Sequence, residues 1–172
     1  MELIELRKEQ VAAFKHEMQE AFQKGYEDRF GKSEERILSE NDIMESLNHP
    51  TATALEAIEN GERLGGAIIA FSDDGRRGDL HFLYTKVGCQ NRGVATFAWN
   101  AIESMYRKVE VWETSTPYFE VRNIHFYVNR CGFHIVEFFN SHHFGSNDFN
   151  ERPVNPMGED GFFRLEKLMD VI

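Results

Sequence analysis

The sequence predicts a mixed α/β domain, in which a mostly antiparallel sheet of about seven strands is flanked by about four helices. Two observations carry this prediction. The apolar residues change between a period of two and a period of three to four in the order β-α-α-β-β-β-α-β-α-β-β. Three successive strands are joined by short turns, and a strand–helix–strand step then requires a crossover to a parallel strand. The 172 residues suffice for a single domain, 1–172, with its own core.

The N-terminal third predicts one strand and two helices. Residues 2–7 alternate between apolar and charged, as a short strand does, and residues 8–24 carry apolar side chains at helical spacing. Ser39 is a typical N-cap for a second helix that ends near Leu47. The stretch between them, GYEDRFGKS (25–33), is similar to a phosphate-binding P-loop but has one residue too many between its glycines and follows a helix. We expect a solvated interhelical turn there.

The remaining elements follow from the same patterns. Asn60-Gly61-Glu62 predicts a hairpin turn, and the strand that ends at Val87 has Leu80, Phe82 and Tyr84 on one face. The expected strands are 52–58, 64–71, 80–87, 109–114, 134–140 and 162–169, and the expected helices are 93–108 and 120–130.

Charge and composition limit the function. The formal net charge is −10, which repels nucleic acid and anionic membranes and favours cationic partners. We find no apolar stretch long enough to span a membrane and no signal-peptide core in MELIELRKEQ, and two cysteines are too few for a disulfide framework. We therefore expect a cytoplasmic protein. The stretch from Arg76 to Arg92 forms a basic island that could receive an anion, since it contains Arg76, Arg77, Lys86 and Arg92 against only Asp79.

The stretch VGCQNRGVATFAW (87–99) places small residues where a strand passes into a helix. The first N–H groups of a helix are unpaired and its dipole is positive there, so a phosphate can bind close to Gly93 and Ala95. Arg92 adds a cation. An ordinary connecting turn explains these residues equally well.

A second motif is RNIHFYVNRCGF (122–133). Ile124, Tyr127, Val128 and Cys131 form a helical stripe, so Tyr127 faces inward. A core tyrosine is one explanation. The other is a proton donor for a leaving thiolate, because a tyrosine stays protonated at neutral pH.

Together, and in this order, the two motifs resemble the GNAT superfamily of acetyl-CoA-dependent N-acetyltransferases. The resemblance covers residues 2–169 and implies the acyl-CoA N-acyltransferase fold, with acetyl-CoA as cosubstrate and an amine as acceptor. By the same resemblance, Tyr127 is the general acid that protonates coenzyme A thiolate. The residues implied to bind the coenzyme are the strand end Tyr84, Thr85, Lys86 and Val87 and the turn residues Gln90, Arg92, Gly93, Val94, Ala95 and Thr96.

This sequence departs from the family pattern at the catalytic acid. Tyr127 precedes Gly132 by five residues, whereas four are usual in the family. Either the helix end holds one extra residue, or Val128 takes the place of the tyrosine. Ala95 also replaces the more common last glycine of the turn.

A base must accept the proton of the amine. Glu113 is our first candidate, and His81, Asp79 and His125 are the others. His142 and His143 are adjacent and lack an evident third ligand, so we expect no metal.

We expect an N-acetyltransferase whose acceptor is a small-molecule or peptide amine, with cationic acceptors favoured by the charge. The alternative is a non-catalytic acyl-CoA-binding or regulatory protein. The aromatic content of 13% is compatible with a homodimer. The acceptor itself is expected to contact the first two helices and residues 141–160.

Overall fold

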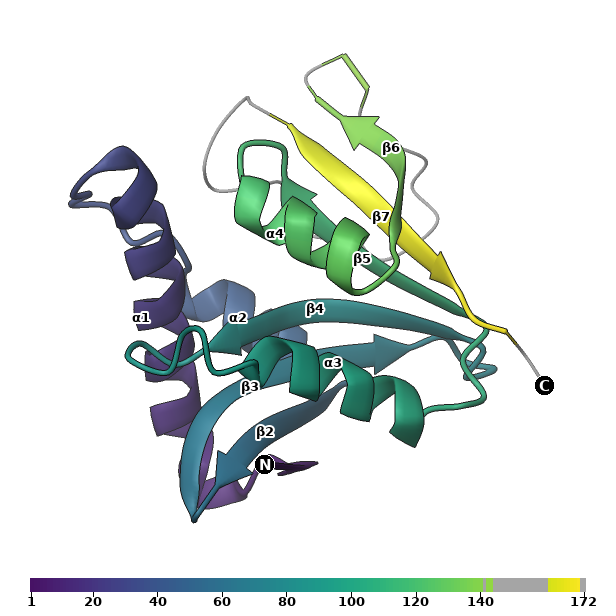
Figure 1. The fold of residues 1–172 in the computed structure, drawn as a ribbon, viewed down its shortest axis with the longest axis horizontal. Helices are drawn as coiled ribbons and strands as arrows, with labels where there is room; N and C mark the ends of the chain where they lie inside the picture. Colours follow the sequence, from purple (N-terminus) through teal and green to yellow (C-terminus); the bar gives the residue numbers. More distant parts are fainter. Residues whose placement is uncertain (141, 144–160, 171–172) are drawn as a thin grey trace.

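The computed structural model describes residues 1–140, 142–143 and 161–170. They form one seven-stranded sheet in the order β1-β2-β3-β4-β5-β7-β6 (Figure 1), flanked by four helices, so the predicted fold class is confirmed. The elements are β1 (Glu2–Glu5), a 3-10 turn (Lys8–Gln10), α1 (Val11–Phe30), α2 (Glu40–Leu47), β2 (Thr53–Glu59), β3 (Glu62–Phe71), β4 (Arg77–Thr85), α3 (Val94–Met105), β5 (Val111–Pro117), α4 (Val121–His125) with a following π-turn (Phe126–Arg130), β6 (His134–Phe139) and β7 (Phe162–Leu168).

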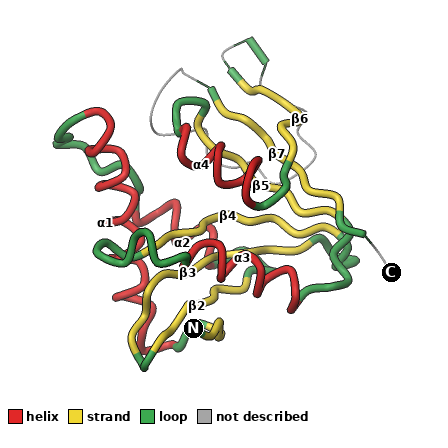
Figure 2. The backbone as a smooth tube through the Cα atoms, viewed as in Figure 1, coloured by secondary structure: helices red, strands yellow, loops and turns green. Residues whose placement is uncertain are grey.

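The helices cover both faces of the sheet (Figure 2). On one face, Phe14 and Met18 of α1 and Ile43 of α2 belong to a buried cluster with Ile68 and Tyr84. On the other face, a larger cluster joins α3 and the segment after α4 to the middle strands: Trp99, Ile102, Tyr127, Cys131, Phe133, Leu80 and Trp112 are among its members. The strands in the middle of the sheet are therefore shielded on both sides.

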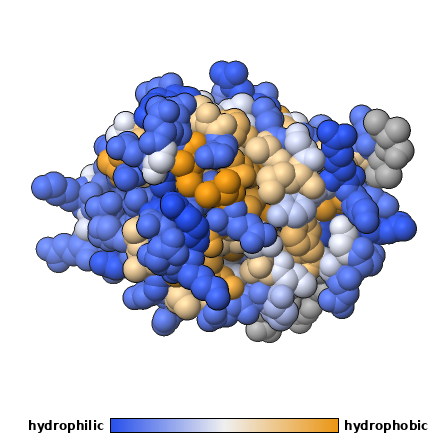
Figure 3. Space-filling model, turned by 90° about the horizontal axis from the view of Figure 1, so that it is seen from below, coloured by the Kyte–Doolittle hydropathy of each residue, from blue (hydrophilic) through white to orange (hydrophobic). Residues whose placement is uncertain are grey.

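The surface is mostly hydrophilic on the face drawn in Figure 3, where apolar area gathers in the middle. Polar side chains surround this area, as expected for a chain with a net charge of −10. Among the described residues, no helix is both long and apolar enough to cross a membrane.

Helix α1 is longer than the sequence pattern predicts. It continues through Gly25 to Phe30, so most of the predicted interhelical turn is helical and this prediction is wrong. Glycine in a helix costs about 1 kcal/mol, but side-chain pairs at i and i+4 support the last turns: Lys24 Nζ lies 2.8 Å from Asp28 Oδ1. The helix ends at Gly31, which has a φ of +88°. Residues that carry a side chain rarely adopt this conformation, so glycine is favoured here.

Strand β4 contains an irregularity that the alternating pattern does not reveal. Ile68 pairs with Phe82 and Ile69 pairs with Leu80, so His81 is an extra residue in β4. Leu80 consequently joins the cluster beneath α3, while Phe82 and Tyr84 face α1 and α2. The prediction that these three side chains share one face is wrong. The strand also begins earlier than predicted and ends at Thr85, before Val87.

A buried ion network ties α1 to the sheet. Arg63 Nε lies 2.7 Å from Glu17 Oε2, and Arg63 Nη1 lies 2.8 Å from Glu56 Oε2. Arg7 Nε is 2.7 Å from the other oxygen of Glu56. The Glu56 and Arg63 side chains are 0% and 5% exposed. Removing one member would leave a buried charge uncompensated.

This network makes stability depend on pH. Burial raises the pKa of Glu17 and Glu56, but hydrogen bonds and charges from Arg63, with Lys86 at Glu17 and Arg7 at Glu56, outweigh it. Both pKa values therefore lie below their ordinary values. A carboxyl with a lowered folded pKa stabilises the fold above its unfolded pKa of about 4.3 and loses this contribution as the pH falls.

We expect the free energy of unfolding, measured by urea denaturation, to decline as the pH falls below about 5. Glu56→Gln should be less stable than the wild type at neutral pH and should show a smaller decline. Equal declines in the two proteins would contradict this account.

Candidate active site

Strands β4 and β5 separate in the middle of the sheet. They pair in parallel from Arg77 with Val111 to Leu80 with Thr114, where Thr114 Oγ1 donates a hydrogen bond of 2.9 Å to the Leu80 carbonyl. Beyond this point β4 continues beside β3, and β5 continues beside β7. Figure 1 shows the two strands diverging, with α3 and α4 on the same side of the sheet. Beyond Leu80 and Thr114, the facing edges of β4 and β5 are therefore no longer paired with each other.

The turn before α3 has the geometry of an anion site. Gly93 is the N-cap with φ +74°, and the N–H of Phe97 makes the first helical hydrogen bond, 2.9 Å to the Gly93 carbonyl. The N–H groups of Val94, Ala95 and Thr96 thus precede the helical ladder, at the positive end of the helix dipole. Val94 is buried, whereas Thr96 is exposed. A Cβ added to Gly93 would meet nothing within 4 Å, so the space above its backbone is open.

Gln90 organises the preceding loop. Its side-chain Oε1 accepts a hydrogen bond of 2.8 Å from the Gly88 N–H. Gly88 and Asn91 have positive φ values, +91° and +63°, which glycine and asparagine adopt more readily than other residues. Gln90 therefore has a structural contact in addition to the predicted role in binding phosphate.

The basic island divides into two parts in the structure. Arg76 and Arg77 lie at the beginning of β4, away from the turn, where Arg76 Nη1 is 3.0 Å from Glu110 Oε1. Lys86 and Arg92 lie at the turn. Lys86 Nζ is 3.2 Å from Glu17 Oε1, and Arg92 Nη2 pairs with Glu59 Oε2. The sequence reasoning missed Glu17 and Glu59, because no local pattern connects residues so distant in the chain.

The side chains of the predicted coenzyme strand, 84–87, differ in burial. The Tyr84 side chain is buried toward α1, and its hydroxyl donates a hydrogen bond of 3.2 Å to Glu17 Oε2. Burial raises the Tyr84 pKa far above its ordinary value, so this phenol stays protonated. The chain leaves β4 after Thr85, and the Lys86 N–H still donates to the Leu64 carbonyl at 2.8 Å. Val87 is exposed.

Tyr127 lies in a π-turn, which accommodates the extra residue before Gly132. The Cys131 N–H donates to the Phe126 carbonyl, five residues earlier, at 3.0 Å. Tyr127 is buried on the α3 side and its ring centroid lies 5.7 Å from that of Phe133. Two explanations were given for the unusual spacing of Tyr127 and Gly132. The π-turn gives a structural basis to the first of them, an extra residue at the end of the helix. Val128 is half-buried and packs against the same cluster.

Glu113, the first candidate base, is held by arginines. Glu113 Oε2 lies 3.3 Å from Arg77 Nη2 and 3.4 Å from Arg164 Nη1. Trp112 and Thr114, its neighbours in β5, point to the α3 side and are buried, so Glu113 points to the opposite face. Its role as base stays a prediction.

The other base candidates have different surroundings. His81 Nδ1 is 2.5 Å from Ser46 Oγ of α2, and His81 Nε2 is 3.2 Å from Asp79 Oδ2. The His125 side chain lies on exposed α4, where its Nδ1 is 2.8 Å from Asn129 Nδ2. The structure thus brings His81 and Asp79 together, next to the point where β4 and β5 separate, and leaves His125 outside this group.

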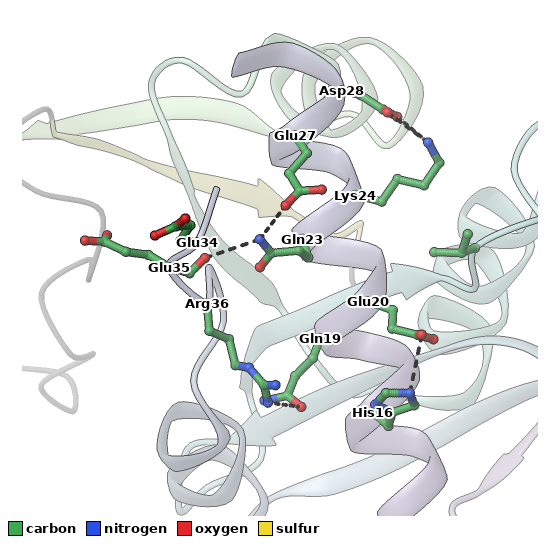
Figure 4. Close-up of a pocket in the computed structure, with 11 residues that line it drawn as sticks. His16, Gln19, Glu20, Gln23, Lys24, Glu27, Asp28, Glu34, Glu35 and Arg36 are labelled. Carbon is green, nitrogen blue, oxygen red and sulfur yellow. Dashed lines mark hydrogen bonds and ion pairs between the residues drawn. The ribbon is translucent and has the colours of Figure 1, made fainter. Parts of the chain in front are cut away.

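A groove of about 770 Å³ runs between α1 and the loop that follows it (Figure 4). It reaches Val87 beside the turn. Acidic side chains outnumber basic ones along it: Glu20, Glu27, Asp28, Glu34 and Glu35 against Lys24 and Arg36. Several are engaged with neighbours, as Figure 4 shows for Glu27 with Gln23. The groove is therefore suited to positively charged groups.

No group of three His, Cys, Asp or Glu side chains within residues 1–140, 142–143 and 161–170 is arranged to hold a metal ion. His143 Nε2 instead lies 2.7 Å from Glu137 Oε1. Of the predicted acceptor loop 141–160, all residues except His142 and His143 lie outside the described part.

Known proteins provide independent comparisons. Residues 12–133 match the model of the family described as "Acetyltransferase (GNAT) family". The uncharacterized protein YrkN of Bacillus subtilis (strain 168) is 38% identical over 174 residues, which cover 97% of this chain and 93% of YrkN.

Two solved structures have similar folds at low sequence identity. The ribosomal-protein-S18-alanine N-acetyltransferase of Escherichia coli has a TM-score of 0.72 at 13% identity, covering 99% of this chain and 95% of that one. The PaiA N-acetyltransferase of Thermoplasma acidophilum, solved with coenzyme A, has a TM-score of 0.67 at 16% identity, covering 98% of each chain. At such identity these likenesses establish the fold.

Proposed function

Because this chain belongs to the GNAT acetyltransferase family, we propose that it transfers the acetyl group of acetyl-CoA to a primary amine by direct attack. The observation that carries the proposal is the separation of β4 and β5 after Leu80, beside the open turn at Gly93. An extended thioester arm fits along the backbone of one diverging strand, and its phosphates fit at the helix N-terminus.

The coenzyme would bind mainly through backbone groups. The N–H groups around Gly93, Val94, Ala95 and Thr96 would hold the pyrophosphate, with the Arg92 guanidinium beside them. The backbone from Tyr84 to Val87 would pair with the pantetheine arm as an added strand does. Gln90 would support this cradle through its contact with Gly88.

Tyr127 is the proposed general acid. The amine nitrogen attacks the thioester carbonyl, the carbon–sulfur bond breaks, and the thiolate takes the phenolic proton. A thiol has a pKa of about 8.5, so its thiolate is a good leaving group but still benefits from a proton donor. The location of Tyr127 in the cluster beneath α3, together with Leu80 at the separation point, supports this role.

We propose a cationic acceptor, such as a polyamine, an aminoglycoside or a lysine side chain. The acidic groove beside Val87 supports this class, since it would attract ammonium groups. We also propose that the protein is cytoplasmic and forms a homodimer. Cys89 and Cys131 are free thiols, which fits a reducing compartment.

The test is thiol release from acetyl-CoA with spermidine, kanamycin and a lysine-containing peptide, together with calorimetric titration of acetyl-CoA. We expect saturable, amine-dependent release, fastest with an acceptor of several positive charges. Tight coenzyme binding without release from any amine would instead indicate a non-catalytic acyl-CoA-binding protein. Absence of coenzyme binding would overturn both functions.

A further inference from the structure

Three polar side chains meet beside the point where β4 separates from β5. Asp79 and His81 come from β4, and Ser46 comes from the last turn of α2. Ser46 Oγ lies 2.5 Å from His81 Nδ1, and Asp79 Oδ2 lies 3.2 Å from His81 Nε2. His81 follows Leu80, the last residue of β4 that pairs with β5. The three side chains thus adjoin the strand segment proposed to bind the thioester.

Local structure brings these residues together. The extra residue in β4 turns His81 toward α2, on the same face as Phe82. In α2, Ile43 and Ser46 are the buried residues, so a hydroxyl stands on the otherwise apolar face of the helix. A buried hydroxyl requires a hydrogen-bond partner, and the imidazole of His81 supplies it.

The chemistry of the three groups favours one direction for the hydrogen bonds. An ionised carboxylate only accepts, so Asp79 favours the tautomer with the proton on His81 Nε2. Nδ1 then carries the lone pair and accepts a hydrogen bond from the Ser46 hydroxyl. Serine, histidine and aspartate follow one another here in the same order as in a Ser-His-Asp triad, in which the histidine accepts the proton of the serine hydroxyl.

We propose that Ser46, His81 and Asp79 form a proton relay that deprotonates the acceptor amine; this inference rests on the proposed acetyl transfer. As the amine nitrogen bonds to the acetyl carbon, its proton passes through one water to Ser46 Oγ while the Ser46 hydroxyl proton passes to His81 Nδ1. Asp79 stabilises the imidazolium. The electron pair of the broken carbon–sulfur bond leaves with the thiolate, which takes the Tyr127 proton, and solvent returns the proton from His81 to Tyr127.

The relay fits the surroundings better than Glu113 does. The carboxylate of Glu113 is already held in ion pairs with Arg77 and Arg164, which occupy its Oε2 atom. Glu113 lies within the paired part of β5, opposite Asp79. His81, in contrast, begins the part of β4 that has left β5, and its side chain is 13% exposed, so a water that carries the proton could reach it.

The kinetic test compares His81→Gln, Ser46→Ala and Asp79→Asn with the wild type and the amine that it acetylates fastest. We expect kcat to fall about 100-fold for His81→Gln and about tenfold for each of the other two, with an unchanged Kd for acetyl-CoA. His134→Gln, on exposed β6, is the matched control and should behave as the wild type. Full turnover by His81→Gln, or a greater loss in Glu113→Gln, would overturn the relay.

A second measurement does not depend on turnover. NMR of the imidazole nitrogens should find the His81 proton on Nε2, and Ser46→Ala should shift the Nδ1 resonance. Asp79→Asn should alter the tautomer. A proton on Nδ1 in the wild type, or an acetyl ester found on Ser46 by mass spectrometry, would overturn the relay. If the wild type releases no thiol with any amine, the proposed function is rejected. The NMR result would still decide whether the Ser46 hydroxyl donates its proton to His81.

Discussion

Tyr127→Phe is expected to lower kcat for thiol release by about 100-fold or more, because general acid catalysis contributes 10²–10⁴-fold and phenylalanine has no proton to donate. The ring contacts with Phe126 and Phe133 remain possible for phenylalanine, so the fold and the Kd for acetyl-CoA should be preserved. The measurement is stopped-flow thiol release at saturating acetyl-CoA, with calorimetry for the Kd.

Tyr118→Phe is the matched control, since Tyr118 is an exposed tyrosine on the segment that follows β5. It should retain wild-type kcat. Equal rates for Tyr127→Phe and the wild type would show that the thiolate leaves without this phenol. The π-turn would then be a feature of packing alone.

Gly93→Val is expected to weaken acetyl-CoA binding by more than about tenfold, or 1.4 kcal/mol. The valine side chain would occupy the open space above the turn, which a phosphate would otherwise fill. The same change also strains the backbone, since φ at Gly93 is +74°. A residue other than glycine in this region costs about 1–3 kcal/mol, so we also expect a lower Tm.

Gly75→Val separates the two effects. Gly75 has a φ of +69° and equally open surroundings, but it lies in the turn between β3 and β4. The Gly75→Val variant should lower the Tm to a similar extent and leave the Kd for acetyl-CoA unchanged. If both variants bind acetyl-CoA as tightly as the wild type, the phosphates are bound elsewhere.

The sequence predicts elements well where local patterns decide them. Ser39 caps α2 as expected, with its Oγ accepting a 3.0 Å hydrogen bond from the Asp42 N–H. Asn60 and Gly61 both have positive φ, as the predicted hairpin turn requires. The turn at Gly93 could be found because its residues are consecutive and its N–H groups come from a helix start.

Features that depend on tertiary contacts could not be predicted. The extra residue in β4 is defined by its pairing with β3, and the alternating pattern of Leu80, Phe82 and Tyr84 continues across it undisturbed. The spacing of Tyr127 and Gly132 indicated an extra residue but left two explanations open, and only the structure shows the π-turn that contains it. For Ser46 a signal did exist: a serine three residues after Ile43 lies on the apolar face of its helix. Only the structure identifies His81 as its partner.

The Arg92–Glu59 pair has a consequence for the kinetics of the coenzyme cycle. If the coenzyme binds as proposed, its pyrophosphate would not enter a vacant cationic site but would displace the Glu59 carboxylate from Arg92. A single small anion would gain little from that exchange, whereas a pyrophosphate that also contacts several N–H groups would gain more. During release, the Glu59 carboxylate could return to Arg92 and compete with the departing coenzyme. Glu59 would then limit product inhibition, although it lies away from the bonds that the proposed reaction makes and breaks.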